Sequence, residues 1–107
     1  MSDRFGLVVK FTLLPGHEEV FDQLVSETLR GIRDREPGTL IYTAHRVRDA
    51  PSERLFYELY RDREAFDAHQ EEPHVRRFLT EREQHLERVE VDFLTVAADK
   101  GLPPSNS

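Results

Sequence analysis

The apolar residues of this chain follow two periods, one typical of strands and one typical of helices. Every second residue over Phe5–Leu13 is apolar, which predicts a strand with one buried face. After a Pro-Gly break at residues 15–16, apolar residues recur at steps of three and four over Glu18–Arg35, which predicts an amphipathic helix. Pro37 and Gly38 then end that helix, because proline restricts the residue before it to extended backbone and glycine tolerates a positive φ.

The middle of the chain predicts a hairpin followed by an interrupted helix. Residues 39–48 are rich in β-branched and aromatic side chains, and residues 55–60 follow at hairpin distance, so we expect the two to pair antiparallel. Asp62 is a good N-cap for a helix that ends near residue 70. Pro73 suits the first turn of a second helical piece that runs to about residue 86.

A last strand is predicted over residues 89–96, where apolar side chains again alternate with polar ones. The resulting order is strand, helix, strand, strand, helix, strand, which is the ferredoxin-like βαββαβ arrangement of the α+β class. We expect a four-stranded antiparallel sheet with the helices on one face. One domain would span residues 1–98, and residues 99–107 would form a C-terminal tail.

The third strand carries large side chains on both faces, which leaves one apolar face of the sheet without helices. Leu55, Tyr57 and Leu59 alternate there with Phe56, Glu58 and Tyr60. An exposed apolar sheet usually marks an interface. We therefore expect a homodimer that pairs sheet on sheet across the face of Leu55, Tyr57 and Leu59.

Composition narrows the possible functions. The chain has 107 residues, no cysteine and a net charge of −6. Missing cysteine removes disulfides, thiolate zinc sites, iron–sulfur clusters and cysteine nucleophiles. The negative charge would repel a phosphate backbone, and no apolar run is long enough for a membrane span, so neither nucleic acid nor a membrane is an expected partner. The N-terminus lacks the pattern of a secretory signal, and we expect a cytoplasmic protein.

Several stretches of the central half resemble the antibiotic biosynthesis monooxygenase family. They are residues 37–42 (Pro-Gly-Thr-Leu-Ile-Tyr), residues 56–66 (Phe-Tyr-Glu-Leu-Tyr-Arg-Asp-Arg-Glu-Ala-Phe), His69, and residues 73–78 (Pro-His-Val-Arg-Arg-Phe). The resemblance extends over about residues 5–97 and implies a dimeric α/β barrel. Such families include cofactor-free oxygenases of quinols and aromatic polyketides, haem-degrading oxygenases, and an isomerase of a phosphorylated sugar; fold transfers between them better than reaction does.

The haem-degrading branch can be tested at three positions. Those enzymes carry Asn, Trp and His where this chain resembles them but has Val9, Tyr60 and Leu79. The resemblance therefore implies neither haem nor any other cofactor. It also implies that Val9, Phe56, Glu58 and Tyr60 face the helices, around the family's pocket.

Glu58 and His69 are the expected catalytic residues. A carboxylate in the middle of an apolar strand must find a partner or shift its pKa upward, and a histidine near it exchanges a proton near neutral pH. The alternative is a structural clasp, in which Glu58 and His69 only join strand to helix. Tyr42, Tyr60, His74, Val9 and Phe56 are the expected substrate-binding residues.

A metal site built from Glu58, His69 and His74 is not favoured, because the two histidines lack the spacing of helical metal ligands. Arg76, Arg77 and Arg82 predict a solvated helix face. Alternatively, they could contact an anionic substrate.

These observations predict a monooxygenase that uses no cofactor and acts on a hydroquinone or an aromatic polyphenol or polyketide, with dioxygen as co-substrate. Two alternatives remain open: an isomerase of a small phosphorylated hydroxyketone, and a module that binds a small molecule without catalysis. Arginines that hold an anion in the pocket would favour the isomerase. A flat apolar slot with Glu58, His69 and tyrosines would favour the oxygenase.

Overall fold

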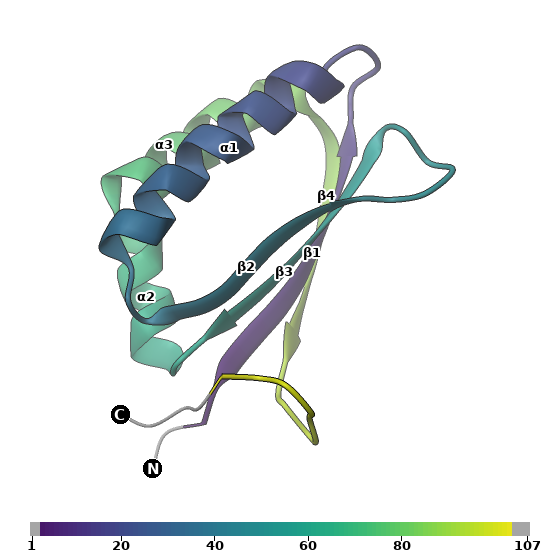
Figure 1. Ribbon diagram of the computed structural model, residues 1–107. Coiled ribbons are helices and arrows are strands. Elements are labelled where there is room, and N and C mark those ends of the chain that lie inside the picture. The colour runs from purple at the N-terminus through teal and green to yellow at the C-terminus, as the bar shows by residue number, and fades with distance from the viewer. Residues whose placement is uncertain (1–2, 104–107) are drawn as a thin grey trace.

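The computed structural model describes residues 3–103, and its elements follow the predicted order (Figure 1). In chain order they are β1 (Phe5–Leu13), α1 (Glu18–Arg35), β2 (Thr39–Arg46), β3 (Glu53–Tyr60), α2 (Arg63–Glu71), α3 (Pro73–Glu81), the 3₁₀ turn η1 (Arg82–His85) and β4 (Leu86–Leu94). The strands form one antiparallel sheet in the order β2-β3-β1-β4. The ferredoxin-like α+β class is therefore confirmed.

The largest difference from the predicted elements is the boundary before the last strand. The sequence predicts a helix to about residue 86, but α3 ends at Glu81 and β4 already begins at Leu86. The amide of Leu14 donates a hydrogen bond of 2.9 Å to the carbonyl of His85, and Leu86 pairs with Leu13 of β1. These contacts with the end of β1 draw the chain into the sheet earlier than its apolar spacing indicates.

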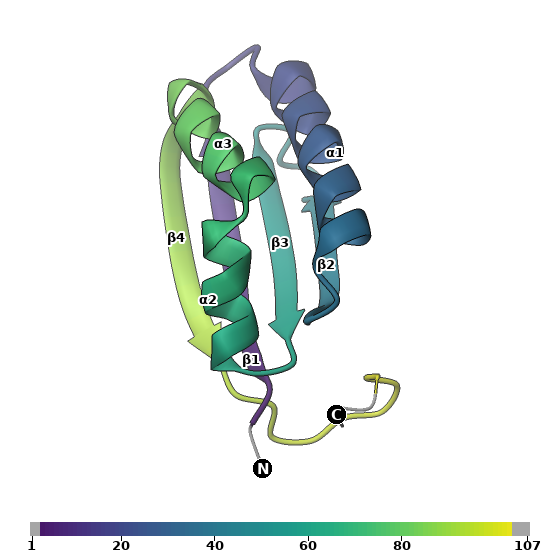
Figure 2. The same cartoon turned by 90° about the vertical axis from the view of Figure 1, so that its left-hand side faces the viewer.

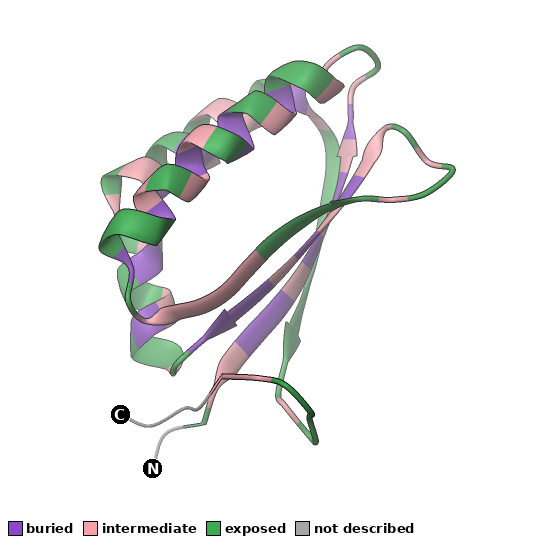
Figure 3. Cartoon of the chain, viewed as in Figure 1, coloured by how far each residue is buried: buried purple, intermediate pink, exposed green. Residues whose placement is uncertain are grey.

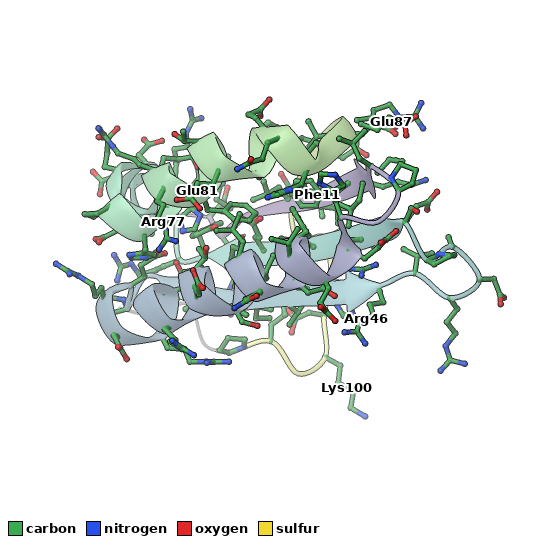
Figure 4. All side chains as sticks on the ribbon, turned by 90° about the horizontal axis from the view of Figure 1, so that it is seen from above. Phe11, Arg46, Arg77, Glu81, Glu87 and Lys100 are labelled. Atoms are coloured by element: carbon green, nitrogen blue, oxygen red, sulfur yellow. The ribbon has the colours of Figure 1, made fainter. Side chains whose placement is uncertain are left out.

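All helices lie on one face of the sheet, as Figure 2 shows: α1 covers the β2 side, and α2 and α3 cover the β1 side. The alternating apolar residues of β1 point toward the helices and are buried. Phe11 is central to this layer, with its ring centroid 4.7 Å from that of Phe56 and 5.3 Å from that of Phe21. Figure 4 shows Phe11 among the side chains between α1 and α3. The predicted N-cap is confirmed, because Asp62 accepts a hydrogen bond of 2.8 Å from the amide of Ala65.

The opposite face of the sheet is less open than the sequence indicates. Leu55 and Tyr57 are half-buried there, but Leu59 is 0% exposed. The segment after β4 folds back beside this face, and its residues 95–100 line a shallow groove together with Tyr57 and Leu59. No helix covers this face, as expected, but Leu59 is already buried within one chain.

The edge strand β4 is exposed along almost its whole length (Figure 3). Of the expected tail, residues 99–103 are described, and residues 104–107 lie outside the described residues. Arg4 holds the described part of the tail through a hydrogen bond to the carbonyl of Pro103 and a 4.0 Å ion pair with Asp99. Within residues 3–103, no helix has both the length and the apolar character that a membrane crossing requires.

Candidate functional site

A cavity of about 140 Å³ lies between the helices and the sheet. Most of its wall is apolar, formed by Leu7, Val9, Phe11, Phe66, Val75, Phe78, Leu79, Val91 and Phe93. Its polar wall consists of Tyr42, Glu58, His69, Gln70 and Arg82. Phe93 and Val91, on the edge strand β4, are 61% and 45% exposed, so the cavity opens along that edge. The arrangement offers a mainly apolar slot with a few polar groups, which is typical of a small-molecule site.

A buried carboxylate behind the cavity holds two imidazoles. Glu36 accepts hydrogen bonds from His69 Nδ1 at 2.6 Å, from His74 Nε2 at 2.5 Å and from Thr39 Oγ1 at 2.7 Å. An ionised carboxylate can only accept, so both ring nitrogens act as donors here. Burial alone would raise the pKa of Glu36, but the hydrogen bonds from His69, Thr39 and His74 outweigh it and lower the pKa below the ordinary value.

The local fold explains how Glu36 reaches both histidines. Glu36 is the C-cap of α1 and has left the helical conformation, with φ −124° and ψ 76°, before Pro37. His69 comes from the last turn of α2, and His74 from the first turn of α3 after the break at Pro73. Gly31 of α1 gives His74 the room it needs, because a Cβ at that position would lie 2.4 Å from His74 Cγ. Three helix ends therefore meet at one carboxylate.

This arrangement fixes the chemistry of His69. With Nδ1 donating to Glu36, the neutral imidazole presents Nε2 as an acceptor. Among residues 3–103, no group makes a hydrogen bond to that nitrogen. The ring lines the cavity, with its centroid 5.8 Å from that of Tyr42 and 5.0 Å from that of Tyr60. His69 is thus a base held in one tautomer at the edge of an apolar cavity.

Glu58 also lies on the cavity, but its partner is not the expected one. Tyr60 donates a hydrogen bond of 2.6 Å to Glu58 Oε1, whereas His69 is bound to Glu36. A direct Glu58–His69 hydrogen bond is therefore absent from the contacts of residues 3–103. Burial raises the pKa of Glu58, and the hydrogen bond from Tyr60 and the nearby His69 and Arg82 offset that rise only in part. Glu58 can hold a proton at a pH where Glu36 cannot.

The remaining predicted residues separate into two groups. Val9 and Tyr42 line the cavity directly. Phe56 and Tyr60 are buried behind its wall, and His74 contributes through Glu36 rather than through the cavity. Burial is also the main reason that the pKa of Tyr42 is raised well above its ordinary value, so Tyr42 faces the cavity as a neutral phenol.

Sequence reasoning missed Glu36 and misplaced Arg82. The sequence indicates no role for Glu36 beyond its place before Pro37, and its only local signal is a charged residue at the end of a helix beside that proline. Arg82 was grouped with Arg76 and Arg77, but it lies in η1 and lines the cavity. Among residues 3–103, no group of three or more histidine, cysteine, aspartate or glutamate side chains is arranged to hold a metal ion.

A comparison with protein families found a match over most of the chain. A family model described as "Antibiotic biosynthesis monooxygenase" matches residues 4–81. The matched region contains Glu36, Glu58 and His69, and it ends one residue before Arg82. The comparison with curated proteins found no match.

Solved structures agree with the fold along nearly the whole chain. The protein PA3566 from Pseudomonas aeruginosa is 31% identical, with 92% of this chain and 98% of that chain covered and a TM-score of 0.83. Rv0793 from Mycobacterium tuberculosis is 23% identical, with 92% and 99% covered and a TM-score of 0.84. SO0527 from Shewanella oneidensis is 22% identical, with 90% and 93% covered and a TM-score of 0.82. The last two show the fold alone.

Proposed function

The chain belongs to the antibiotic biosynthesis monooxygenase family, and from that premise we propose that it is a cofactor-independent monooxygenase of a hydroquinone or a related electron-rich phenol. The observation that carries this proposal is His69, a base on the wall of an apolar cavity whose Nδ1 is fixed by Glu36 at 2.6 Å. Deprotonation of a phenol makes the ring electron-rich enough to reduce dioxygen itself. The protein then has to supply a base and a site without water.

The proposed reaction balances without an external reductant. One hydroquinone and one dioxygen give one hydroxyquinone and one water, and the substrate provides all the electrons. His69 Nε2 takes the first phenolic proton, and the imidazolium that forms is stabilised by Glu36. Glu58, whose raised pKa lets it hold a proton, exchanges the second proton with the reduced oxygen.

The size of the cavity limits the part of the substrate that enters it. At about 140 Å³ it is smaller than a typical ligand pocket, which measures roughly 300–1,000 Å³. One aromatic ring fits such a space. A larger polyphenol or polyketide would keep its other rings outside, on the exposed side chains of Val91 and Phe93.

Oxygen consumption with simple hydroquinones tests the proposal. We expect wild-type protein to accelerate uptake, and His69→Ala to lower the rate roughly a hundredfold or more, because the positioned base is lost. His45→Ala is the matched control, since His45 is exposed on β2 and bonds only Thr43. Equal uptake by wild type and His69→Ala, with the fold intact by circular dichroism, would leave Glu36 and His69 as a structural clasp.

An isomerase of a small phosphorylated hydroxyketone is the second candidate, because Arg82 places one guanidinium on the cavity wall. Glu58 and His69 would then move a proton between neighbouring carbons of the substrate. A single arginine in a mainly apolar wall suits a phosphate dianion less well than a phenolate. Deuterium exchange at the α-carbon of such a sugar phosphate, followed by NMR, would decide for this candidate.

We also propose that the protein forms a homodimer through the sheet face away from the helices. Leu55, Tyr57, Val8 and Ile41 remain half-buried on that face within one chain. Covering them with a second sheet would remove this apolar surface from water. Sedimentation at micromolar concentration tests the proposal: a stable monomer would contradict it, and Tyr57→Asp is expected to weaken the dimer by placing an unpaired charge in the contact.

A further inference from the structure

Arg82 is a mostly buried cation on the cavity wall, and its Nε has no hydrogen-bond partner among residues 3–103. Its side chain is 19% exposed, and its Nε is fully buried without a partner. The nearest carboxylate oxygen, on Glu83, lies 3.9 Å from Nε, which is too far for a hydrogen bond. The guanidinium carbon instead lies 5.4 Å from the ring centroid of Phe11 and 5.6 Å from that of Phe78. Arg82 thus lines the cavity with an N–H donor that no described residue accepts from.

Two other arginines, Arg77 and Arg54, each have a carboxylate within hydrogen-bond distance. Arg77 is 58% exposed and bonds Glu81 at 2.6 Å, and Figure 4 shows these two side chains next to each other. The buried Arg54 donates two hydrogen bonds to the carboxylate of Asp22, at 2.8 and 3.0 Å. Arg82 has only the 3.9 Å ion pair with Glu83 in place of such hydrogen bonds, and a mostly buried guanidinium paired so weakly costs free energy unless a ligand supplies an anion.

The groups that share the cavity wall with Arg82 leave room for a negative ligand. Tyr42 is a neutral phenol there, and His69 carries no negative charge. Glu58 is the one carboxyl among the described lining residues, and its raised pKa favours the protonated form as pH falls. An anion that enters the slot therefore meets one fixed positive charge between aromatic rings.

We propose that Arg82 is the anion-binding residue of the cavity and that it selects single-ring phenols by holding their phenolate oxygen with charge-assisted hydrogen bonds. This inference rests on the proposed function and names its substrate class: acidic phenols, bound as phenolates, in preference to uncharged aromatic ethers. It also assigns Arg82 a chemical role beside His69. His69 removes the proton, and Arg82 stabilises the negative charge that remains on oxygen.

Binding without turnover tests the proposal under nitrogen. The probe is 4-nitrophenol, whose phenolate absorbs visible light and whose phenol does not; 4-nitroanisole is its uncharged isostere. We expect wild type to bind 4-nitrophenolate at least about tenfold more tightly than 4-nitroanisole, and to lower the pKa of the bound phenol by about one unit. Arg82→Met keeps the packing on Phe11 and Phe78 and should lose this preference, whereas Arg82→Lys should keep part of it.

Arg77→Met is the matched control and should keep the full preference, because Arg77 is exposed on α3. Equal affinity of wild type for the two probes, or no binding of 4-nitrophenol, would overturn the proposal even if Arg82→Met did not fold. An unchanged preference in a folded Arg82→Met would do the same. Because no oxygen is consumed, a phenolate preference that depends on Arg82 in a protein without oxygenase activity would support this inference and reject the oxygenase alone.

Discussion

Glu36 and Glu58 are equally hidden from solvent, with 8% and 6% of their surface exposed, yet the protein moves their pKa values in opposite directions. Burial raises the pKa of both carboxyls. Glu36 accepts hydrogen bonds from two imidazoles and one hydroxyl, which reverse the effect of burial. Glu58 accepts one hydrogen bond, from Tyr60, and its pKa stays raised. The donors that Glu36 has and Glu58 lacks lower the pKa of Glu36 relative to that of Glu58, so Glu36 ionises at a lower pH.

Glu36 and Glu58 also differ in the roles that their surroundings allow. Glu36, whose pKa is lowered, accepts hydrogen bonds from His69 and His74 and so joins the ends of α1, α2 and α3. Glu58 is a carboxyl on the cavity that can gain or lose a proton. Pairs of titratable groups whose environments separate their pKa values are typical of acid–base catalysts. The substitutions below alter either Glu36 and its partners or Glu58, and leave the other carboxyl unchanged.

The largest effect is expected from Glu36→Gln. The variant removes the negative charge that accepts hydrogen bonds from His69 and His74. Glutamine has only one oxygen acceptor, so one of the two imidazole N–H groups faces the NH₂ group and loses its acceptor. Losing hydrogen bonds to a charged acceptor and leaving a buried N–H donor unpaired costs about 3 kcal/mol of unfolding free energy. Urea denaturation measures this loss, and oxygen uptake should fall with it because His69 is no longer held in one tautomer.

Glu87→Gln is the control for that change, since Glu87 is exposed on β4. A surface substitution of this kind changes stability by no more than about 0.5 kcal/mol. If Glu36→Gln were as stable as Glu87→Gln, the carboxylate would not be what holds the three helix ends together.

Gly31→Ala should destabilise the protein although alanine is the better helix former. A Cβ at residue 31 would lie 2.4 Å from Cγ of His74, so His74 has to leave its position against Glu36. Overpacking of this kind costs about 1–3 kcal/mol, against a helix-propensity gain of about 1 kcal/mol. Thermal denaturation of the variant measures the net loss.

The His74→Ala background reverses the sign of the same change. Without the imidazole the new Cβ has room, and Gly31→Ala should then raise the unfolding free energy by about 1 kcal/mol through helix propensity alone. A loss of similar size in both backgrounds would mean that His74 is not the group that requires glycine at position 31.

Glu58→Gln should change how stability depends on pH. The folded pKa of Glu58 lies above its ordinary value of 4.5, so its stabilising contribution is complete below pH 4.5 and is lost as pH rises through the folded pKa. Glutamine does not ionise and escapes that loss. Compared with wild type, the variant should therefore gain up to about 1.4 kcal/mol per pH unit across this window.

The two glutamates should give opposite pH profiles. The folded pKa of Glu36 lies below 4.5, so its contribution is complete above pH 4.5 and is lost as pH falls through the folded pKa. Urea denaturation across the acidic and neutral range separates the two windows. Profiles of the same sign for Glu36→Gln and Glu58→Gln would contradict the comparison between the two carboxyls.

The sequence was sufficient to predict the fold because nearly every stretch of periodic apolar residues ends at a proline, a glycine or a capping residue. The clearest failure, the end of the last helix, occurred where Leu86 continues the helical spacing of apolar residues while its backbone pairs with Leu13. That pairing joins residues more than seventy positions apart, and no local pattern encodes it. The family resemblance for Val9, and strand alternation for Glu58, predict the face of the sheet on which both side chains lie.

Only part of the candidate site could be predicted, because contacts between residues far apart in the sequence leave no local pattern. His69 and Tyr42 could be placed from their own elements and from the family resemblance. Glu36 could not, because its role depends on a contact with a histidine 33 positions away on a different helix. Arg82 was grouped with its neighbours in sequence, and only the end of α3 at Glu81 turns it toward the cavity.

The smallest effect is expected from Thr39→Val, which removes one of the three donors to Glu36 and nearly preserves the shape of the side chain. The lost hydrogen bond, 2.7 Å from Thr39 Oγ1 to Glu36 Oε1, should cost about 1 kcal/mol. With fewer donors, the folded pKa of Glu36 should rise toward 4.5, so acid unfolding should begin at a higher pH than in wild type. Thr39→Ser keeps the hydroxyl and should retain the wild-type midpoint. Equal acid midpoints for Thr39→Val and Thr39→Ser would mean that the two imidazoles alone hold Glu36 in its ionised form.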